Sequence, residues 1–263
     1  MMHQREITDK KVCVVVPCFN EEHRFPLLEF ENAYKSYDFH FVFVNDGSTD
    51  STCDILKHFM IGREDRVTVI DSRINKGKAE AVRSGILHAN KSKTFSIIGF
   101  VDADLATPLE EIYPLIKHID GRHLCAFGAR IGNKRAAIER RFHRHVISRC
   151  FSFYTQAILR VKATDSQCGA KFFNSAVVEQ LFSDPFETKW LFDIEIYFRI
   201  KDQMRMRSTE SVIAEVPLNS WKDMPGSKIR FKRVLQIASE IARIQYRQLF
   251  RKTSSRILPT ETE

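Results

Sequence analysis

Two aspartates, Asp102 and Asp104, stand one residue apart at the end of an apolar run, and their spacing could support metal chemistry. The run from Ser96 to Val101 is rich in apolar and β-branched residues, which predicts a buried strand. Side chains two positions apart on a strand point to the same face, so the two carboxylates can converge just past its carboxyl end. Converging carboxylates repel each other unless a cation compensates them, and hard oxygen ligands favour Mg²⁺ or Mn²⁺ shared with substrate phosphates. Asp102 and Asp104 are therefore candidate ligands of a divalent metal.

A purely structural role competes with this interpretation. The residues from Thr107 to Glu110 have the pattern of a capping box, with a proline at the first helical position. The two aspartates would then only end a strand before a capped helix. Because short motifs often occur by chance, the rest of the chain has to decide between the two roles.

The composition of the chain indicates a folded protein with a sizeable core. Its 263 residues are 43% hydrophobic, with only 10 glycines and 8 prolines, which suits one large domain or one domain with an extension. The 6 cysteines are scattered without C-x-x-C spacing, which argues against a disulfide framework or a zinc site and predicts a reducing, cytosolic compartment. The polar amino terminus, and the lack of an apolar run of about 18 residues, predict neither a signal peptide nor a transmembrane helix.

The net charge of +8 is compatible with nucleic acid, an anionic membrane surface or a phosphate-bearing substrate as partner. Cations are concentrated in residues 130–160 and 228–256, where they alternate with large apolar residues. Nucleic-acid-binding proteins more often combine basic residues with aromatics on a sheet, or present a bare basic helix. The pattern therefore favours membrane and phosphate over nucleic acid.

The first half of the chain alternates between strand and helix patterns. Apolar runs predict strands and helical spacing predicts helices, in the order strand 11–16 (ended by Pro17), helix 23–36, strand 39–44, helix 48–59, strand 67–70 and helix 76–89. Such alternation calls for right-handed crossovers and a mainly parallel sheet with helices on both faces. The sequence thus predicts an α/β fold.

Three polar loops follow strands of this predicted sheet, at the edge where α/β proteins bind nucleotides. In the loop 17–22, Asn20 and Glu21 could bind a base or ribose, or only cap a helix. In the loop 45–50, Asp46 precedes a glycine turn, which could equally be a structural Asp-Gly turn with an N-cap. The loop 75–78 is a basic glycine turn whose backbone N–H groups and lysines suit phosphate. Together, in this order, the loops predict a nucleotide site.

Five segments carry a resemblance to a known family: VVPCFNEE, VNDGSTDST, NKGKAEAVRSGI, FVDADLATP and DSQCGAKFF. They resemble the family-2 glycosyltransferases with the type-A fold, and among these the polyprenyl-phosphate sugar transferases. The similarity runs from about residue 12 to about residue 229, so we expect a catalytic domain over 1–228 and a separate segment over 229–263. The resemblance implies a mainly parallel nucleotide-binding sheet flanked by helices.

The resemblance also implies residue roles on the donor side. The nucleotide would be held by residues of the first two loops, namely Pro17, Phe19, Asn20, Glu21 and Asp46. A divalent ion, Mg²⁺ or Mn²⁺, would hold the diphosphate at Asp102 and Asp104, with Ala103 between them. Mannose synthases of the family have Gln where this chain has Ala106, which favours UDP-glucose over GDP-mannose as donor. Ala79 replaces a second glycine that is common in the glucosyl branch, which weakens that assignment.

On the acceptor side, residues 134–159 are predicted to form a long helix in which arginines alternate with large apolar residues. Arg140 and Arg144 are spaced i, i+4 and share a face, at the place where the family has its lipid-phosphate arginines. Guanidinium groups suit phosphate oxygens. The same apolar stripe could instead pack on the protein core or lie on a membrane.

Three further motifs of the second half resemble elements around the sugar in this family. The segment DSQCGAK contains Asp165, the segment WLFDIE contains Asp193, and the loop WKDMPGSK contains Ser227 and Lys228, which would approach phosphate. Each has a plain alternative: a structural turn, a helix cap and a solvated surface loop, respectively.

Residues 229–250 combine apolar and basic positions in the manner of a helix lying in a membrane interface, and the tail from 253 is polar. We therefore expect a peripheral protein on the cytoplasmic face of a membrane. The sequence leaves open whether a separate membrane subunit anchors it.

These features predict an inverting transfer of a hexose, most simply glucose from UDP-glucose, to a dolichyl or undecaprenyl phosphate. Asp104 would act with the metal, and Lys78 or Lys228 would hold the charge of the departing UDP. A phosphate monoester, with a second pKa of about 6, is already ionised and needs no general base. A sugar hydroxyl as acceptor would need one, and Asp165 or Asp193 would be the candidates. The alternatives are a GDP-mannose-dependent enzyme, a family-2 transferase acting on a polysaccharide, and a non-catalytic basic binding protein.

Overall fold

The computed structural model describes residues 10–130, 163–189, 191–203 and 209–222. The helices predicted over 134–159 and 229–250 lie outside these residues, as do Arg140, Arg144, Ser227 and Lys228. The boundary that we predicted at residue 228 therefore stays a prediction.

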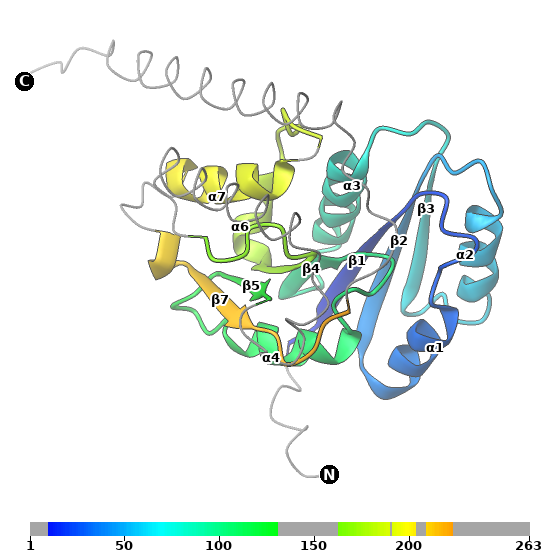
Figure 1. The fold of residues 1–263 in the computed structure, drawn as a ribbon, viewed down its shortest axis with the longest axis horizontal. Helices are drawn as coiled ribbons and strands as arrows, with labels where there is room; N and C mark the ends of the chain where they lie inside the picture. The colour runs from blue at the N-terminus through cyan, green and yellow to red at the C-terminus, as the bar shows by residue number, and fades with distance from the viewer. Residues whose placement is uncertain (1–9, 131–162, 190, 204–208, 223–263) are drawn as a thin grey trace, which may run out of the picture.

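A seven-stranded sheet forms the centre of the described structure, with the strand order β3-β2-β1-β4-β6-β5-β7 (Figure 1). Its strands are β1 (Val12–Cys18), β2 (Phe39–Asp46), β3 (Val67–Ser72), β4 (Ile97–Val101), β5 (Cys125–Ala129), β6 (Ala170–Asn174) and β7 (Ile213–Pro217). Strand β1 is parallel to β2 and β4, and β2 is parallel to β3. Strand β6 runs antiparallel to β4 and β5, whereas β7 is parallel to β5. The predicted α/β fold is confirmed, with one half of the sheet parallel and the other half mixed.

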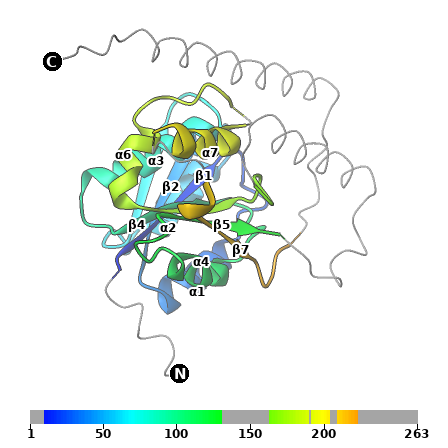
Figure 2. The same ribbon diagram turned by 90° about the vertical axis from the view of Figure 1, so that its left-hand side faces the viewer.

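Helices cover both faces of the sheet (Figure 2). They are α1 (Leu27–Ser36), α2 (Thr52–Met60), α3 (Lys78–Lys91), α4 (Ile112–Lys117), α6 (Ser175–Phe182) and α7 (Phe192–Gln203), with short 3-10 turns η2 (Leu109–Glu111) and η4 (Thr209–Ser211). One apolar cluster joins α3, α6 and α7 to one face, and a second joins α1, α2 and α4 to the other. Side chains of β1 alternate between the two faces, so Val15 packs in the cluster with α3, α6 and α7, and Val14 packs in the cluster with α1, α2 and α4.

Several predicted element boundaries are wrong: the helix predicted from residue 23 begins at Leu27, the helix predicted from residue 48 begins at Thr52, and the first strand does not end before Pro17. Strand β1 continues through Pro17, which pairs with Val44, to Cys18. Pairing of β1 with β4 has already ended at Val15, so the missing N–H of the proline leaves no partner unsatisfied on that side. The capping box is also absent: Pro108 is extended at the N-cap of η2 without a side-chain cap, and the Thr107 hydroxyl lies 3.9 Å from Cys168 Sγ.

Five cysteines of the described residues are free thiols: Cys13, Cys18, Cys53, Cys125 and Cys168. Within the same residues, no helix is long and apolar enough to cross a membrane.

Candidate active site

The D-x-D pair lies at the carboxyl edge of the sheet, in a turn directly after β4. The N–H of Leu105 donates to the carbonyl of Asp102 over 3.0 Å, and the N–H of Ala106 donates to Asp104 Oδ1 over 3.0 Å. Leu105 has a φ of 48°, in the left-handed region. The two carboxylates are thus placed by a tight turn, and not by strand alternation as we had expected.

Lys78, at the start of α3, forms an ion pair with the buried Oδ1 of Asp102. Desolvation lowers the pKa of Lys78, but the carboxylates of Asp102 and Asp193, with Asp104 behind them, outweigh it and raise that pKa. The lysine therefore remains charged at neutral pH. It brings a cation from the predicted phosphate loop to the first aspartate of the D-x-D pair.

Asp46 organises the basic glycine turn that precedes Lys78. Its two carboxylate oxygens accept from the N–H groups of Lys76 and Gly77, each over 2.8 Å. Gly77 has a φ of 93°, a conformation that favours glycine. These two N–H groups are engaged by Asp46, so the expectation that the turn offers them to phosphate is not met in this structure.

The first two polar loops are hydrogen-bonded to each other. Asn20, with a φ of 52°, accepts from the N–H of Thr49 over 2.9 Å through Oδ1, and its own N–H donates to Ser48 Oγ over 3.1 Å. The N–H of Glu21 donates to Thr52 Oγ1 over 2.7 Å. Phe19 beside them is 41% exposed, which leaves its ring accessible at this edge.

Glu21 carries its charge close to the D-x-D pair. Arg24 contacts its carboxylate over 2.6 Å. Burial raises the pKa of Glu21, Arg24 lowers it, and Asp104 and Asp102 raise it further, so that the net shift is upward. Three carboxylates therefore influence one another at this edge, which is an environment that attracts a cation.

Asp165 and Asp193 are both paired with cations. Arg130 donates two hydrogen bonds to the carboxylate of Asp165, from Nε over 2.6 Å and from Nη2 over 2.9 Å. Burial raises the pKa of Asp165, but Arg130 outweighs it and lowers that pKa. Asp193 Oδ1 accepts from Lys171 Nζ over 2.6 Å. Each carboxylate is thus engaged by a cationic side chain, Asp165 by Arg130 and Asp193 by Lys171.

The segment leading to residues 223–228 begins beside the D-x-D turn. The N–H of Lys222 donates to the carbonyl of Ala106 over 2.8 Å. Glu111, which is buried, accepts from the N–H groups of Asn219 and Ser220 over 3.1 Å and 2.9 Å. The first residues of the predicted phosphate loop, Trp221 and Lys222, therefore lie beside the D-x-D turn at Ala106.

The carboxylate oxygens at this edge suit a hard divalent cation. Within the described ranges, no group of three or more His, Cys, Asp or Glu side chains is arranged to hold a metal. Asp102 and Asp104 would supply carboxylate oxygens, and Mg²⁺ commonly takes its remaining ligands from water and substrate phosphates. The ion pair of Asp102 with Lys78 shows that this carboxylate is already compensated by a positive charge.

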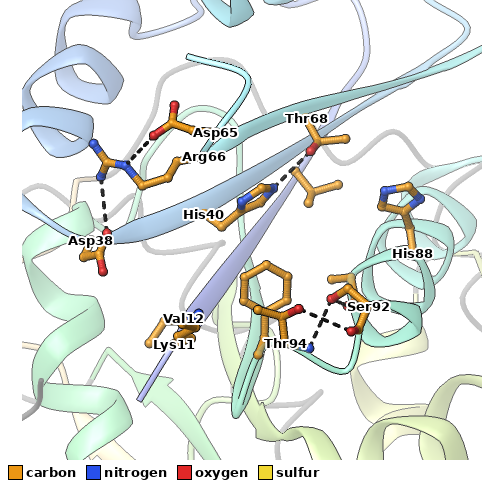
Figure 3. A pocket seen from close by; sticks show the side chains of 13 residues that line it. Lys11, Val12, Asp38, His40, Asp65, Arg66, Thr68, His88, Ser92 and Thr94 are labelled. Carbon is orange, nitrogen blue, oxygen red and sulfur yellow. Dashed lines mark hydrogen bonds and ion pairs between the residues drawn. The ribbon is translucent and has the colours of Figure 1, made fainter. Parts of the chain in front are cut away.

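A separate cleft of about 480 Å³ opens at the opposite, amino edge of the sheet (Figure 3). His40 and His88 face it, and His40 Nε2 lies 3.0 Å from Thr68 Oγ1. Burial lowers the pKa of His40. The beginnings of β1, β2 and β3 line this cleft, so it has no part in the D-x-D site.

Three residues of the site region were not anticipated from the sequence: Arg130, Lys171 and Glu111. Arg130 follows β5 directly, so its position at a strand's carboxyl end was a usable signal. Lys171 ends the segment DSQCGAK, so the resemblance of that segment was a usable signal, whereas Glu111 carries none because its partners Asn219 and Ser220 are distant in the sequence.

A parallel half-sheet with acidic and basic loops at its carboxyl edge is the arrangement of the type-A glycosyltransferase fold. A family model described as Glycosyl transferase family 2 matches residues 13–182. The chain belongs to this family and is a glycosyltransferase.

Curated dolichyl-phosphate beta-glucosyltransferases match most of this chain, and a bacterial relative matches a shorter part of it. A human dolichyl-phosphate beta-glucosyltransferase is 28% identical over 91% of this chain and 76% of its own length. The Saccharomyces cerevisiae protein of the same name is 29% identical over 82% of this chain and 68% of its own. A prophage bactoprenol glucosyl transferase homolog of Escherichia coli is 38% identical over 41% of this chain and 35% of its own.

Two solved structures support the fold. The mannosyltransferase PcManGT of Pyrobaculum calidifontis, in complex with GDP-Man and Mn²⁺, has a TM-score of 0.59 at 19% identity. The match covers 88% of this chain and 62% of that one. Glucosyl-3-phosphoglycerate synthase of Mycobacterium tuberculosis, in complex with UDP, has a TM-score of 0.57 at 16% identity, over 89% and 80% of the two chains. The predicted family and type-A fold are confirmed.

Proposed function

We propose that this enzyme transfers glucose from UDP-glucose to a polyprenyl phosphate, with inversion at the anomeric carbon. The Lys78–Asp102 ion pair supports the donor half most directly, because it brings a cation and a metal-type carboxylate together at the carboxyl edge of the sheet. The dolichyl-phosphate beta-glucosyltransferases, similar over most of the chain, support the glucose and the lipid phosphate.

On the donor side, Phe19, Asn20, Glu21 and Asp46 would form the nucleotide site, with Pro17 and Ala103 beneath it. Asp102 and Asp104 would hold Mg²⁺ or Mn²⁺, which when bound neutralises the diphosphate and favours departure of UDP. Lys78 would help to stabilise the negative charge of the departing UDP, since its ammonium group already forms an ion pair with Asp102.

On the acceptor side, an oxygen of the lipid phosphate would form a bond to the anomeric carbon as the bond from that carbon to UDP breaks. The phosphate is already ionised, so no proton has to be removed. The pairing of Asp165 with Arg130 and of Asp193 with Lys171 supports this acceptor over a sugar hydroxyl, because both carboxylates already accept hydrogen bonds from cationic side chains. We assign both a positioning role.

The acceptor phosphate would be bound by four residues that we assign from their positions in the sequence motifs: Arg140, Arg144, Ser227 and Lys228. Two anions must approach each other in this reaction, which is unfavourable unless cations lie between or beside them. The basic and apolar residues of 229–252 would place the enzyme on the cytoplasmic face of a membrane, where its lipid acceptor resides.

Release of UDP or GDP from UDP-glucose and GDP-mannose, measured with and without a short polyprenyl phosphate, tests the proposal. We expect rapid release from UDP-glucose only when the lipid phosphate is present. Arg140→Ala and Arg144→Ala should raise the KM for lipid phosphate and leave the KM for UDP-glucose unchanged. The exposed Arg122 provides the control, Arg122→Ala. Preference for GDP-mannose, or glucose transfer to a polysaccharide but not to lipid phosphate, would refute the assignment.

A further inference from the structure

Lys171 is a fully buried cation on β6, and its hydrogen bonds connect the loop before β6 to α7. Its side chain is 0% exposed and lies 5.7 Å from the ring centres of both Phe100 and Phe127. Burying an ammonium group among aromatic rings is costly unless every N–H finds a partner. Lys171 satisfies this demand with one carboxylate and two backbone carbonyls.

The three partners of Lys171 Nζ come from two different segments. Asp193, in the first turn of α7, accepts over 2.6 Å. The carbonyls of Ser166 and Cys168 accept over 3.0 Å and 2.6 Å. The buried ammonium therefore fixes the backbone of the loop 165–169 against α7. A nonpolar side chain could fill the same volume, but it could not hold these carbonyls.

Gly169, the last residue of this loop, lies in contact with the D-x-D turn. Its carbonyl accepts from the N–H of Asp102 over 3.1 Å. A Cβ added to Gly169 would lie 2.3 Å from Oδ2 and 2.4 Å from Cγ of Asp102. The Asp102 carboxylate thus rests directly on the backbone of Gly169, and a small shift of the loop would move it.

We infer that Lys171 is a positioning residue for the cation–diphosphate site, acting on Asp102 through the loop 166–169. This inference rests on the proposed role of Asp102 in donor binding. Because its side chain is fully buried, Lys171 would act indirectly. It sets the place of the backbone that supports the carboxylate, which must be held to within about 0.5 Å for productive binding.

The test compares Lys171→Met with a variant in a second buried ion pair, which lies on α7, the helix that also carries Asp193. Arg199 pairs with Glu195 over 2.9 Å, both side chains being 8% exposed, and Arg199 donates to carbonyls of Leu181, Asp184 and Pro185. Arg199→Met should therefore destabilise the fold without reaching the D-x-D turn. Calorimetric titration of UDP in Mn²⁺, well below each Tm, measures the donor site independently of turnover.

We expect Lys171→Met to weaken UDP binding in Mn²⁺ by at least about tenfold, and to raise the KM for UDP-glucose but not for lipid phosphate. Arg199→Met should lower Tm and leave UDP affinity within about twofold of wild type. The double variant Lys171→Met with Asp193→Asn leaves no unpaired buried charge and provides a second reading if the single variant does not fold. It should show the same loss, because the two carbonyl contacts are still missing.

Wild-type UDP affinity in a folded Lys171→Met protein, or in the folded double variant, would overturn the inference and leave Lys171 as a core ion pair. Failure of the proposed function has a different signature. In that case the wild-type enzyme would bind UDP with Mn²⁺ but would not glucosylate lipid phosphate, and the affinity comparison between Lys171→Met and Arg199→Met would still decide the role of Lys171.

Discussion

At the scale of single residues, the two aspartates of the D-x-D pair have different surroundings. Asp102 rests on Gly169 and pairs with Lys78, whereas Asp104 accepts a hydrogen bond from the N–H of Ala106 in its own turn. An asparagine at position 104 can keep that hydrogen bond through its amide oxygen. The substitution therefore separates the charge of the side chain from its structural contact.

We expect Asp104→Asn to abolish glucose transfer and to weaken Mn²⁺-dependent UDP binding by about tenfold or more, because one of two carboxylates facing the cation loses its charge. Calorimetry of UDP with and without Mn²⁺ measures the effect, and the Tm should stay near that of wild type. Asp65→Asn, an exposed carboxylate at the amino-edge cleft, is the control. Equal UDP binding by Asp104→Asn and wild type would mean that the pair only ends a strand.

At the scale of elements, Glu111 connects η2 to the segment after β7. Its carboxylate accepts from the backbone and side chain of both Asn219 and Ser220. This places the chain after β7 along the D-x-D turn, where Lys222 bonds to Ala106. One buried carboxylate thus determines where the predicted phosphate loop begins.

Glu111→Ala should lower the free energy of unfolding by about 1–3 kcal/mol, because buried N–H groups lose their acceptor. Urea unfolding measures the difference. The adjacent Glu110 is exposed, so Glu110→Ala should change the free energy of unfolding by no more than about 0.5 kcal/mol. Similar losses for both variants would show that the effect comes from the charge of the turn and not from the hydrogen bonds of Glu111.

At the scale of the whole molecule, acid stability depends on carboxylates that bridge elements. Asp71, in β3, accepts from Lys57 of α2 and from Asn45 of β2, each over 2.8 Å. The hydrogen bond from Lys57, followed by that from Asn45, lowers the pKa of Asp71 from 3.8 to about 2. A lowered pKa in the folded state stabilises the protein above the unfolded-state pKa, and this contribution is lost as the pH falls through the folded-state value.

Wild type should therefore be more stable than Asp71→Asn at pH 7, and the difference should close as the pH falls from near 3.8 toward about 2. The side chain of Asp71 is 42% exposed, so solvent screening keeps the effect modest. Chemical unfolding across this pH range provides the measurement, with Asp54→Asn, an exposed carboxylate of α2, as the charge control. A difference that stays constant with pH would exclude this linkage.

The sequence by itself determined the alternation of strands and helices in the first half, the polar loops that follow the strands, and the family. These features depend on neighbouring residues: apolar periodicity, glycine turns and short motifs. It also placed Lys78 and Asp102 in separate loops that a parallel sheet must bring to one edge.

Only the tertiary structure decided which charges meet. The antiparallel β6 lies between β4 and β5, and this arrangement buries Lys171 between Phe100 and Phe127. Arg130 and Asp165 meet across 35 positions, and Glu111 and Ser220 across 109. Such pairs depend on strand order and on the path of distant loops, which local periodicity does not encode. For that reason the sequence could offer Asp165 and Asp193 as bases for a sugar hydroxyl acceptor, but it did not show that Asp165 pairs with Arg130 and Asp193 with Lys171.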